Sequence, residues 1–198
     1  MKGLINRRLK GGTPLGLLSR YSENTCKEQD VEHAKNGNKE AFSRLIMKNE
    51  KSMYRIAKSI LKNDEDCADA IQEAIIKAYK GIHKLKNTEF FKTWLIKIII
   101  NESSRLLRSK NRLVSVNEIY YICEDNQLTE FDRNEIEVRH AVDSLDSDLK
   151  VVTVLHYYED LSVKRMAEIL AIPEGTIKSR LSRARSVLYN ALELKEEI

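Results

Sequence analysis

Residues 161–185 have the sequence LSVKRMAEILAIPEGTIKSRLSRAR, and this stretch indicates the architecture of the C-terminal part of the chain. Ser162 is of a type that caps helix N-termini, and we expect a short helix from there to Leu170. The residues up to Pro173 predict a turn, and a second helix follows at Gly175 and beyond. Two helices joined by so short a turn form a helix-turn-helix.

The second of these helices separates an apolar face from a polar one. At about 100° per residue, one side is lined by Ile177, Leu181, Ala184 and Leu188. The other side carries Lys178, Ser179, Ser182, Arg183 and Ser186, with Arg180 and Arg185 at its flanks. Such side chains suit base edges in a major groove, and the flanking arginines suit phosphates. Four of the residues 178–185 are basic and none is acidic, which favours DNA binding over a merely solvated helix face.

Glycine and proline are scarce outside the N-terminal end. The 198 residues include 7 glycines and 2 prolines, and four of these glycines together with Pro14 lie within the first sixteen positions. Gly81 is the only helix breaker between Asn38 and Ile172. Because sheet proteins need turn residues every 8 to 12 positions or so, we predict an all-α fold.

Helical periodicity divides the chain into two groups of helices. Apolar residues recur at three- and four-residue steps from Phe42 to Leu61 and from Ile71 to Ile82, and a third helix is expected from near Phe90 to about Arg108. Seven acidic residues and one basic residue between positions 117 and 137 indicate a linker. We therefore predict two small helical domains joined by a flexible acidic linker: a flexible N-terminal extension at 1–29, a first domain at 30–112, the linker at 113–138 and a second domain at 139–194.

A second basic stripe lies on the third helix of the first domain. One face of this helix carries Trp94, Lys97, Asn101, Arg105 and Arg108. An aromatic ring beside cations and an amide is suited to stacking on single-stranded nucleic acid and following its backbone. The alternative for the tryptophan alone is a place in the core.

The remaining composition argues against several functional classes. The 34 Lys and Arg residues exceed the 30 Asp and Glu residues by only four, and the three cysteines are widely spaced with no CxxC pair. Neither a disulfide framework nor a zinc site is indicated, and the four histidines form no metal or catalytic motif. We therefore expect a protein without cofactor or metal. No apolar run is long enough to span a bilayer, so we also expect a cytoplasmic protein without membrane insertion.

Three motifs together resemble the extracytoplasmic-function (ECF) sigma factors of bacterial RNA polymerase, within the sigma-70 superfamily. They are DCADAIQE at 66–73, FKTWLIKI at 91–98 and IPEGTIKSRLSRAR at 172–185, and the likeness covers about residues 30–192. The resemblance implies that the first domain is sigma region 2 and the second is sigma region 4. It implies a promoter-specificity subunit without catalytic activity of its own.

The resemblance also assigns candidate site residues. Docking on the clamp helices of the large polymerase subunit would involve Asp66, Asp69, Gln72 and Glu73. The pocket for a base flipped out of the minus-ten element would be formed by Lys86, Asn87, Thr88 and Glu89, and the melted strand would be faced by Trp94, Lys97, Asn101, Arg105 and Arg108. The minus-thirty-five element would be contacted by Thr176, Lys178, Ser179, Arg180, Ser182 and Arg183.

The partners implied are core RNA polymerase, promoter DNA and an anti-sigma factor, commonly one anchored in the membrane. One alternative is a free-standing helix-turn-helix regulator that binds duplex DNA as a dimer, with half-sites one helical turn apart. A second alternative is a helical adaptor that binds only protein. Binding to DNA without polymerase would favour the first, and an absence of any promoter effect would favour the second.

Overall fold

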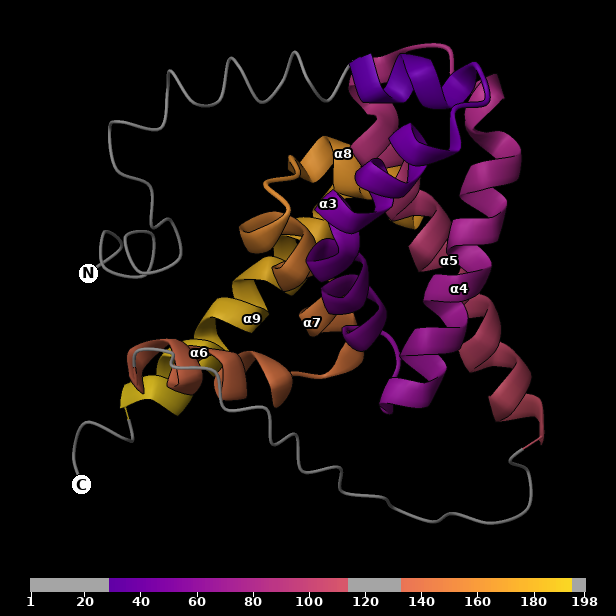
Figure 1. Cartoon of the computed structure of the whole chain (residues 1–198). Helices are drawn as coiled ribbons and strands as arrows, with labels where there is room; N and C mark the ends of the chain where they lie inside the picture. Colours follow the sequence, from indigo (N-terminus) through magenta and orange to yellow (C-terminus); the bar gives the residue numbers. More distant parts are fainter. Residues whose placement is uncertain (1–28, 114–132, 194–198) are drawn as a thin grey trace.

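The computed structural model describes residues 29–113 and 133–193, and every regular element in these two ranges is helical, as predicted (Figure 1). We call the two ranges the first and second domains. The first contains a short helix at 29–35, then α3 (Lys39–Lys58), α4 (Asp64–Gly81), η1 (Ile82–Lys84), η2 (Thr88–Phe90) and α5 (Phe91–Leu113). The second contains α6 (Arg133–Asp143), α7 (Ser147–Thr153), the π-helix η3 (Val154–Tyr158), α8 (Val163–Leu170) and α9 (Glu174–Glu193).

The core of the first domain is formed where α3, α4 and α5 pack on one another. The apolar stripes predicted from the sequence supply it, with Leu45, Ile56 and Ile99 almost fully buried. Asparagine side chains begin the first two long helices: Asn38 accepts a hydrogen bond from the Ala41 amide, and Asn63 caps α4 in the same way. Such caps satisfy amides that have no partner within the helix.

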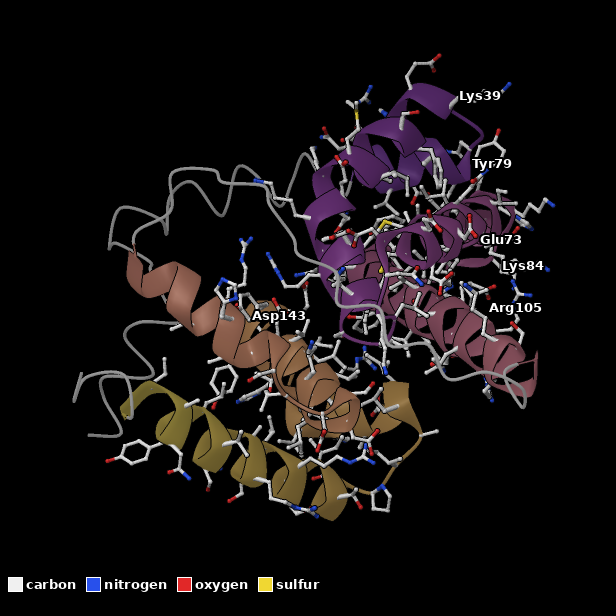
Figure 2. The ribbon with its side chains drawn as sticks, turned by 90° about the horizontal axis from the view of Figure 1, so that it is seen from below. Lys39, Glu73, Tyr79, Lys84, Arg105 and Asp143 are labelled. Atoms are coloured by element: carbon white, nitrogen blue, oxygen red, sulfur yellow. The ribbon has the colours of Figure 1, made fainter. Side chains whose placement is uncertain are left out.

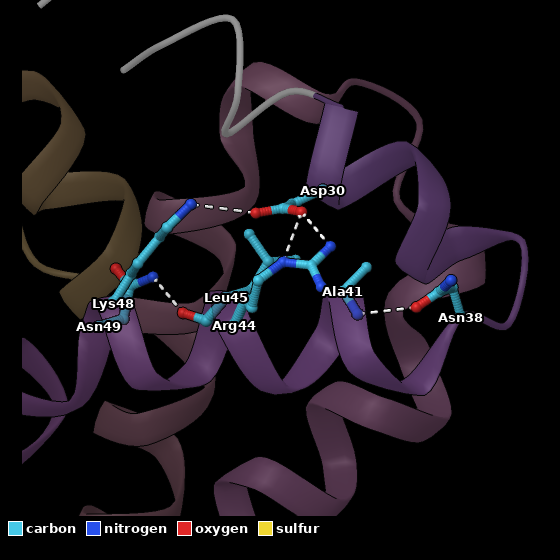
Figure 3. A network of polar contacts seen from close by, with 7 residues as sticks. All are labelled: Asp30, Asn38, Ala41, Arg44, Leu45, Lys48 and Asn49. Carbon is cyan, nitrogen blue, oxygen red and sulfur yellow. Dashed lines mark hydrogen bonds and ion pairs between the residues drawn. The ribbon is translucent and has the colours of Figure 1, made fainter.

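An ion-pair network fastens the short helix at 29–35 to α3 (Figure 3). Arg44 donates to Oδ1 of Asp30 at 2.7 Å, and Lys48 donates to Oδ2 at 3.0 Å. The hydrogen bond from Arg44 contributes most to holding the pKa of Asp30 below its usual range. The network therefore fixes the start of the described chain against the face of α3.

The helix-turn-helix forms where the sequence predicts it. Ser162 Oγ accepts a hydrogen bond from the Arg165 amide at 3.3 Å and caps α8. The turn contains Ala171 in the left-handed region at φ 54°, a conformation that glycine adopts more easily. The predicted apolar face of α9 is buried: Ile177 is 0% exposed and Leu181 is 3% exposed.

The α6 helix extends the second domain toward the N-terminus. It begins at Arg133, within the range predicted as linker. Residues 114–132 of that range lie outside the described residues, as do residues 1–28 of the extension predicted at 1–29. Val138, Val142 and Leu145 pack in a small cluster with Leu188 of α9. Because these apolar residues need a partner, the helix continues upstream of the predicted boundary.

The two domains lie against each other, with α3 between α4 and the second domain (Figure 1). Buried residues of both domains form one continuous apolar cluster. One stripe residue departs from its predicted place: Tyr79, expected in the core, is 45% exposed, although its ring contacts Phe42 edge-on at 5.1 Å. In the two described ranges, no helix is both long enough and apolar enough to cross a bilayer.

Candidate nucleic-acid interface

An exposed stripe on α4 combines acidic, amide and apolar side chains. Asp69, Gln72 and Glu73 are exposed, as the sequence predicted, and Ile76 continues the stripe at 39% exposure. Figure 2 shows Glu73 and Tyr79 on the side of the first domain that faces away from the second domain. An exposed isoleucine and tyrosine beside carboxylates form a surface suited to another protein rather than to DNA, because phosphates repel carboxylates.

Asp66 lies apart from this stripe. It is only 6% exposed, and its carboxylate pairs with Lys110 of α5 and accepts a hydrogen bond from the Asn63 amide group at 3.1 Å. These contacts join the N-terminal end of α4 to the C-terminal half of α5. The structure thus brings three of the four predicted polymerase-binding residues together at the surface and places the fourth inside.

The loop before α5 presents polar side chains to solvent. Lys86, Asn87 and Glu89 are exposed, and Thr88 is half-buried. The Asn87 side chain accepts a hydrogen bond from the Glu89 amide at 3.0 Å and so caps η2. Phe90, which follows directly, is an exposed aromatic residue at 48%.

The basic stripe on α5 forms one continuous exposed face. Lys97, Asn101, Arg105 and Arg108 are exposed along it, whereas Trp94 at its start is half-buried. A Cβ atom at Gly81 would lie 3.2 Å from Cζ2 of Trp94. Glycine at this position therefore lets the indole ring approach α4 closely, and Trp94 contributes to the core as well as to the surface.

A buried carboxylate lies beneath this stripe. Glu102 is 5% exposed and pairs with Lys77 of α4 at 2.5 Å and with Arg105 at 2.9 Å. Burial raises the pKa of Glu102, but the hydrogen bonds from Lys77 and Arg105 outweigh it, and the pKa ends below the ordinary value. The carboxylate thus stays charged, and its hydrogen bond with Arg105 holds that side chain in place. Figure 2 shows Arg105 on α5.

The polar face of α9 points away from the core. Lys178, Ser179, Ser182 and Arg183 are exposed there, while Thr176 and Arg180 are half-buried. Arg180 pairs with Asp148 of α7, and Lys178 lies 4.0 Å from Glu174. Within the described residues, Arg183 forms no ion pair, so its guanidinium group is available to a ligand.

Sequence reasoning missed several exposed or paired residues. Ile76 and Phe90 are large apolar side chains at exposed positions. Ile76 lies three residues after Glu73 on the exposed face of α4, and the pattern of buried apolar stripes gives neither residue a role. Three further residues, Arg55, Lys92 and Glu159, form a contact between the domains. Arg55 and Glu159 are 104 positions apart, and no local pattern links them.

Family models match both domains. The model of sigma-70 region 2 matches residues 45–113, and the model of sigma-70 region 4 matches residues 135–188. The first match contains α4, the loop before α5 and α5 itself, and the second contains the helix-turn-helix. The elements that carry the three exposed surfaces are thus those that define the two regions.

Curated relatives extend the likeness to most of the chain. The RNA polymerase sigma factor SigV of Bacillus subtilis is 30% identical over 72% of this chain and 86% of its own length. The RNA polymerase sigma-H factor of Pseudomonas aeruginosa is 29% identical over 84% and 93%. The ECF RNA polymerase sigma-E factor of Escherichia coli is 27% identical over 87% and 97%.

Solved structures share the fold. CnrH, in complex with the cytosolic domain of CnrY, has a TM-score of 0.60 at 21% identity and covers 85% of this chain and 98% of its own. RpoE of Bartonella quintana, in complex with the anti-sigma factor NepR, has a TM-score of 0.63 at 24% identity, with coverage of 77% and 96%. The chain belongs to the sigma-70 family as an ECF sigma factor, a non-catalytic subunit with which RNA polymerase initiates transcription.

Proposed function

We propose that each of the three exposed surfaces performs a different binding function of a sigma factor. The α4 stripe would bind core RNA polymerase, the loop 86–89 and the α5 face would hold the melted minus-ten strand, and the polar face of α9 would recognise the minus-thirty-five element. The proposal uses the residues that the family resemblance assigns. Their exposure and charge support it.

The observation that carries the proposal is the α4 stripe, because a sigma factor acts only through core polymerase. Asp69, Gln72 and Glu73 present charged and amide groups, and Ile76 adds apolar area that a partner helix could bury. Asp66 would act indirectly, since its pairing with Lys110 holds the stripe in position rather than reaching a partner. Interfaces commonly combine an apolar centre with a polar rim.

The α5 face suits a single strand. Lys97 and Arg108 would contact the phosphates, and Arg105 is oriented for the same task by Glu102. The exposed part of Trp94 would stack on a base, and Lys86, Asn87, Thr88 and Glu89 would surround a flipped one. Asn87 would have a double task, since its side chain already caps η2.

The α9 face suits duplex DNA. Lys178, Ser179, Ser182 and Arg183 would contact base edges in the major groove, whereas Thr176 and Arg180, at the margin of the face, would contact phosphates. The pairing of Arg180 with Asp148 holds it at this margin.

We infer two further features from the relatives. Of the two proteins of similar fold, RpoE was solved in complex with the anti-sigma factor NepR and CnrH with the cytosolic domain of CnrY. We propose that an anti-sigma factor, anchored in the membrane, also binds this chain. We place the chain in the cytoplasm, where bacterial polymerase and promoters are found.

The test of the α4 stripe is Asp69→Lys in a pull-down with core polymerase. We expect loss of binding, because the substitution reverses the charge at the N-terminal end of the stripe. The matched control is Glu50→Lys, which makes the same change of charge at an exposed position of α3 outside the stripe. Unchanged polymerase affinity of Asp69→Lys, or equal loss in the control, would refute the assignment. Specific binding of a protein dimer to duplex DNA without polymerase would favour a free-standing regulator.

A further inference from the structure

The contact between the two domains buries a carboxylate. Glu159 follows the π-helix η3 of the second domain, and its side chain is 1% exposed. It pairs with two cations of the first domain, at 3.3 Å with Arg55 of α3 and at 2.9 Å with Lys92 of α5. We call Arg55, Lys92 and Glu159 the interdomain clasp. A buried carboxylate without these partners would be strongly destabilising.

Two cation–π contacts also link the domains. The Arg55 guanidinium group lies 4.6 Å from the ring centre of Tyr158, next to Glu159. A second pair crosses in the opposite direction, with Arg165 of α8 4.9 Å from the ring centre of Phe90. Each of these cation–π contacts adds a modest attraction. Together with the apolar cluster shared by the two domains, these contacts form an interface that combines apolar packing with specific polar pairs.

An irregular stretch of backbone positions Glu159 at the domain contact. The π-helix ends with the Glu159 amide donating to the Val154 carbonyl at 3.2 Å, and Asp160 then adopts the left-handed region at φ 55°. The Leu161 amide returns to the Leu155 carbonyl at 3.0 Å. Single π-helical turns and left-handed non-glycine residues are uncommon and often occur at functional positions.

The clasp lies beside the surfaces that would contact the melted strand. Lys92 is in the first turn of α5, and Phe90 directly follows the loop 86–89. The closed arrangement of the two domains is also too small to contact both promoter elements. A compact body of 198 residues has a radius of gyration of about 16 Å, hence a diameter of about 40 Å. Elements about 25 base pairs apart are separated by about 85 Å. The domains must therefore separate on a promoter.

We propose that the interdomain clasp holds the free protein in a closed state that must open before it binds core polymerase and promoter DNA. Opening removes Glu159 from its two cations and frees Phe90 from Arg165. The closed state rests on the contacts alone, whereas its consequence for the promoter rests on the proposed function. Because the apparent affinity of a partner falls with the fraction of competent protein, a closed fraction of about 90% would weaken polymerase binding about tenfold.

The test uses the full chain with Arg55→Ala and Lys92→Ala combined. Both side chains are partly exposed and belong to the first domain. Their removal does not alter the packing within the second domain, so a change measured in the second domain reports the loss of the domain contact. We expect the amides of Glu159 and Leu161 to exchange hydrogen at least about tenfold faster, a difference of about 1.4 kcal/mol. The radius of gyration in solution should rise, and polymerase affinity should increase.

Two further variants complete the test. Glu159→Lys should open the protein from the other side, and adding Arg55→Glu should restore slow exchange by reversing the pair. The control Asp143→Lys makes the same charge change at a carboxylate that pairs within the second domain, with Lys150, and should leave exchange unchanged. Unchanged exchange and size in both clasp variants would overturn the closed state. Absence of transcription in every variant, wild type included, would instead overturn the proposed function.

Discussion

The faces of α5 and α9 are both basic, yet they are supported in different ways. Beneath α5, buried carboxylates pair with cations: Glu102 holds Lys77 and Arg105, and Asp66 holds Lys110. Beneath α9, the contacts are apolar, through residues such as Ile177 and Leu181, and its ion pairs lie at the surface. In the described residues, the one buried carboxylate of the second domain, Glu159, pairs with the first domain.

This difference matches the two kinds of DNA that the faces would contact. A melted strand is flexible, so cations fixed in advance lose less entropy when they bind its phosphates. Duplex DNA presents a regular groove, and side chains on an exposed helix can adjust to base edges there. We therefore predict that buried carboxylates fix the positions of the basic side chains of α5, whereas the position of the α9 face depends on apolar packing.

The largest effect is expected for Ile177→Ala. This side chain is fully buried under α9, and truncation of a buried isoleucine costs about 2 to 5 kcal/mol. Urea unfolding of the full chain, followed by circular dichroism, measures the change. Ser186→Ala, on the exposed face of the same helix, is the control and should change stability little. A loss below about 1 kcal/mol for Ile177→Ala would contradict an apolar support for α9.

A smaller loss of stability is expected for Glu102→Gln. The variant keeps the size of the side chain but removes the charge that pairs with Lys77 and Arg105, at a cost of about 1 to 3 kcal/mol. Because the folded pKa of Glu102 lies below its ordinary value of 4.5, the charge stabilises the protein above that pH, and this contribution is lost as the pH falls through the folded value. The difference from wild type should shrink below about pH 4.5. A difference that is constant with pH would contradict the role of the charge.

Arg183→Ala on the α9 face should weaken recognition of the upstream promoter element. A side chain that contacts a base contributes about 1 to 3 kcal/mol, and its loss should relax recognition at one position of the upstream element. Lys164→Ala on α8 is the contrast, since an exposed lysine on the first helix of the motif would contact phosphate. It should weaken binding to all sequences alike and reduce the salt dependence. Holoenzyme binding to duplexes that differ at single positions distinguishes the two results.

The sequence alone predicted the elements whose signal is local. Helical periodicity placed α3, α4 and α9, and the cap at Ser162 located the helix-turn-helix to within a residue or two. The exposed face of α9 followed from the same periodicity, because apolar residues at three- and four-residue steps leave the remaining positions to solvent.

Features that depend on distant residues were not predicted. Asp66 carries the same charge as Asp69, and only the position of Lys110 on another helix makes it a buried partner. Tyr79 fits the apolar stripe of α4, yet its neighbours leave part of the ring exposed. The interdomain clasp joins residues 104 positions apart. Such contacts arise from tertiary packing, which periodicity within one helix does not report.

The most direct test of the account is run-off transcription in vitro with core RNA polymerase on a fragmented genomic template, with and without this protein. We expect discrete new transcripts whose start sites share two spaced upstream elements, and their loss with Asp69→Lys. An absence of new transcripts, together with specific DNA binding by the protein alone, would contradict the assignment of the three surfaces and favour a free-standing regulator.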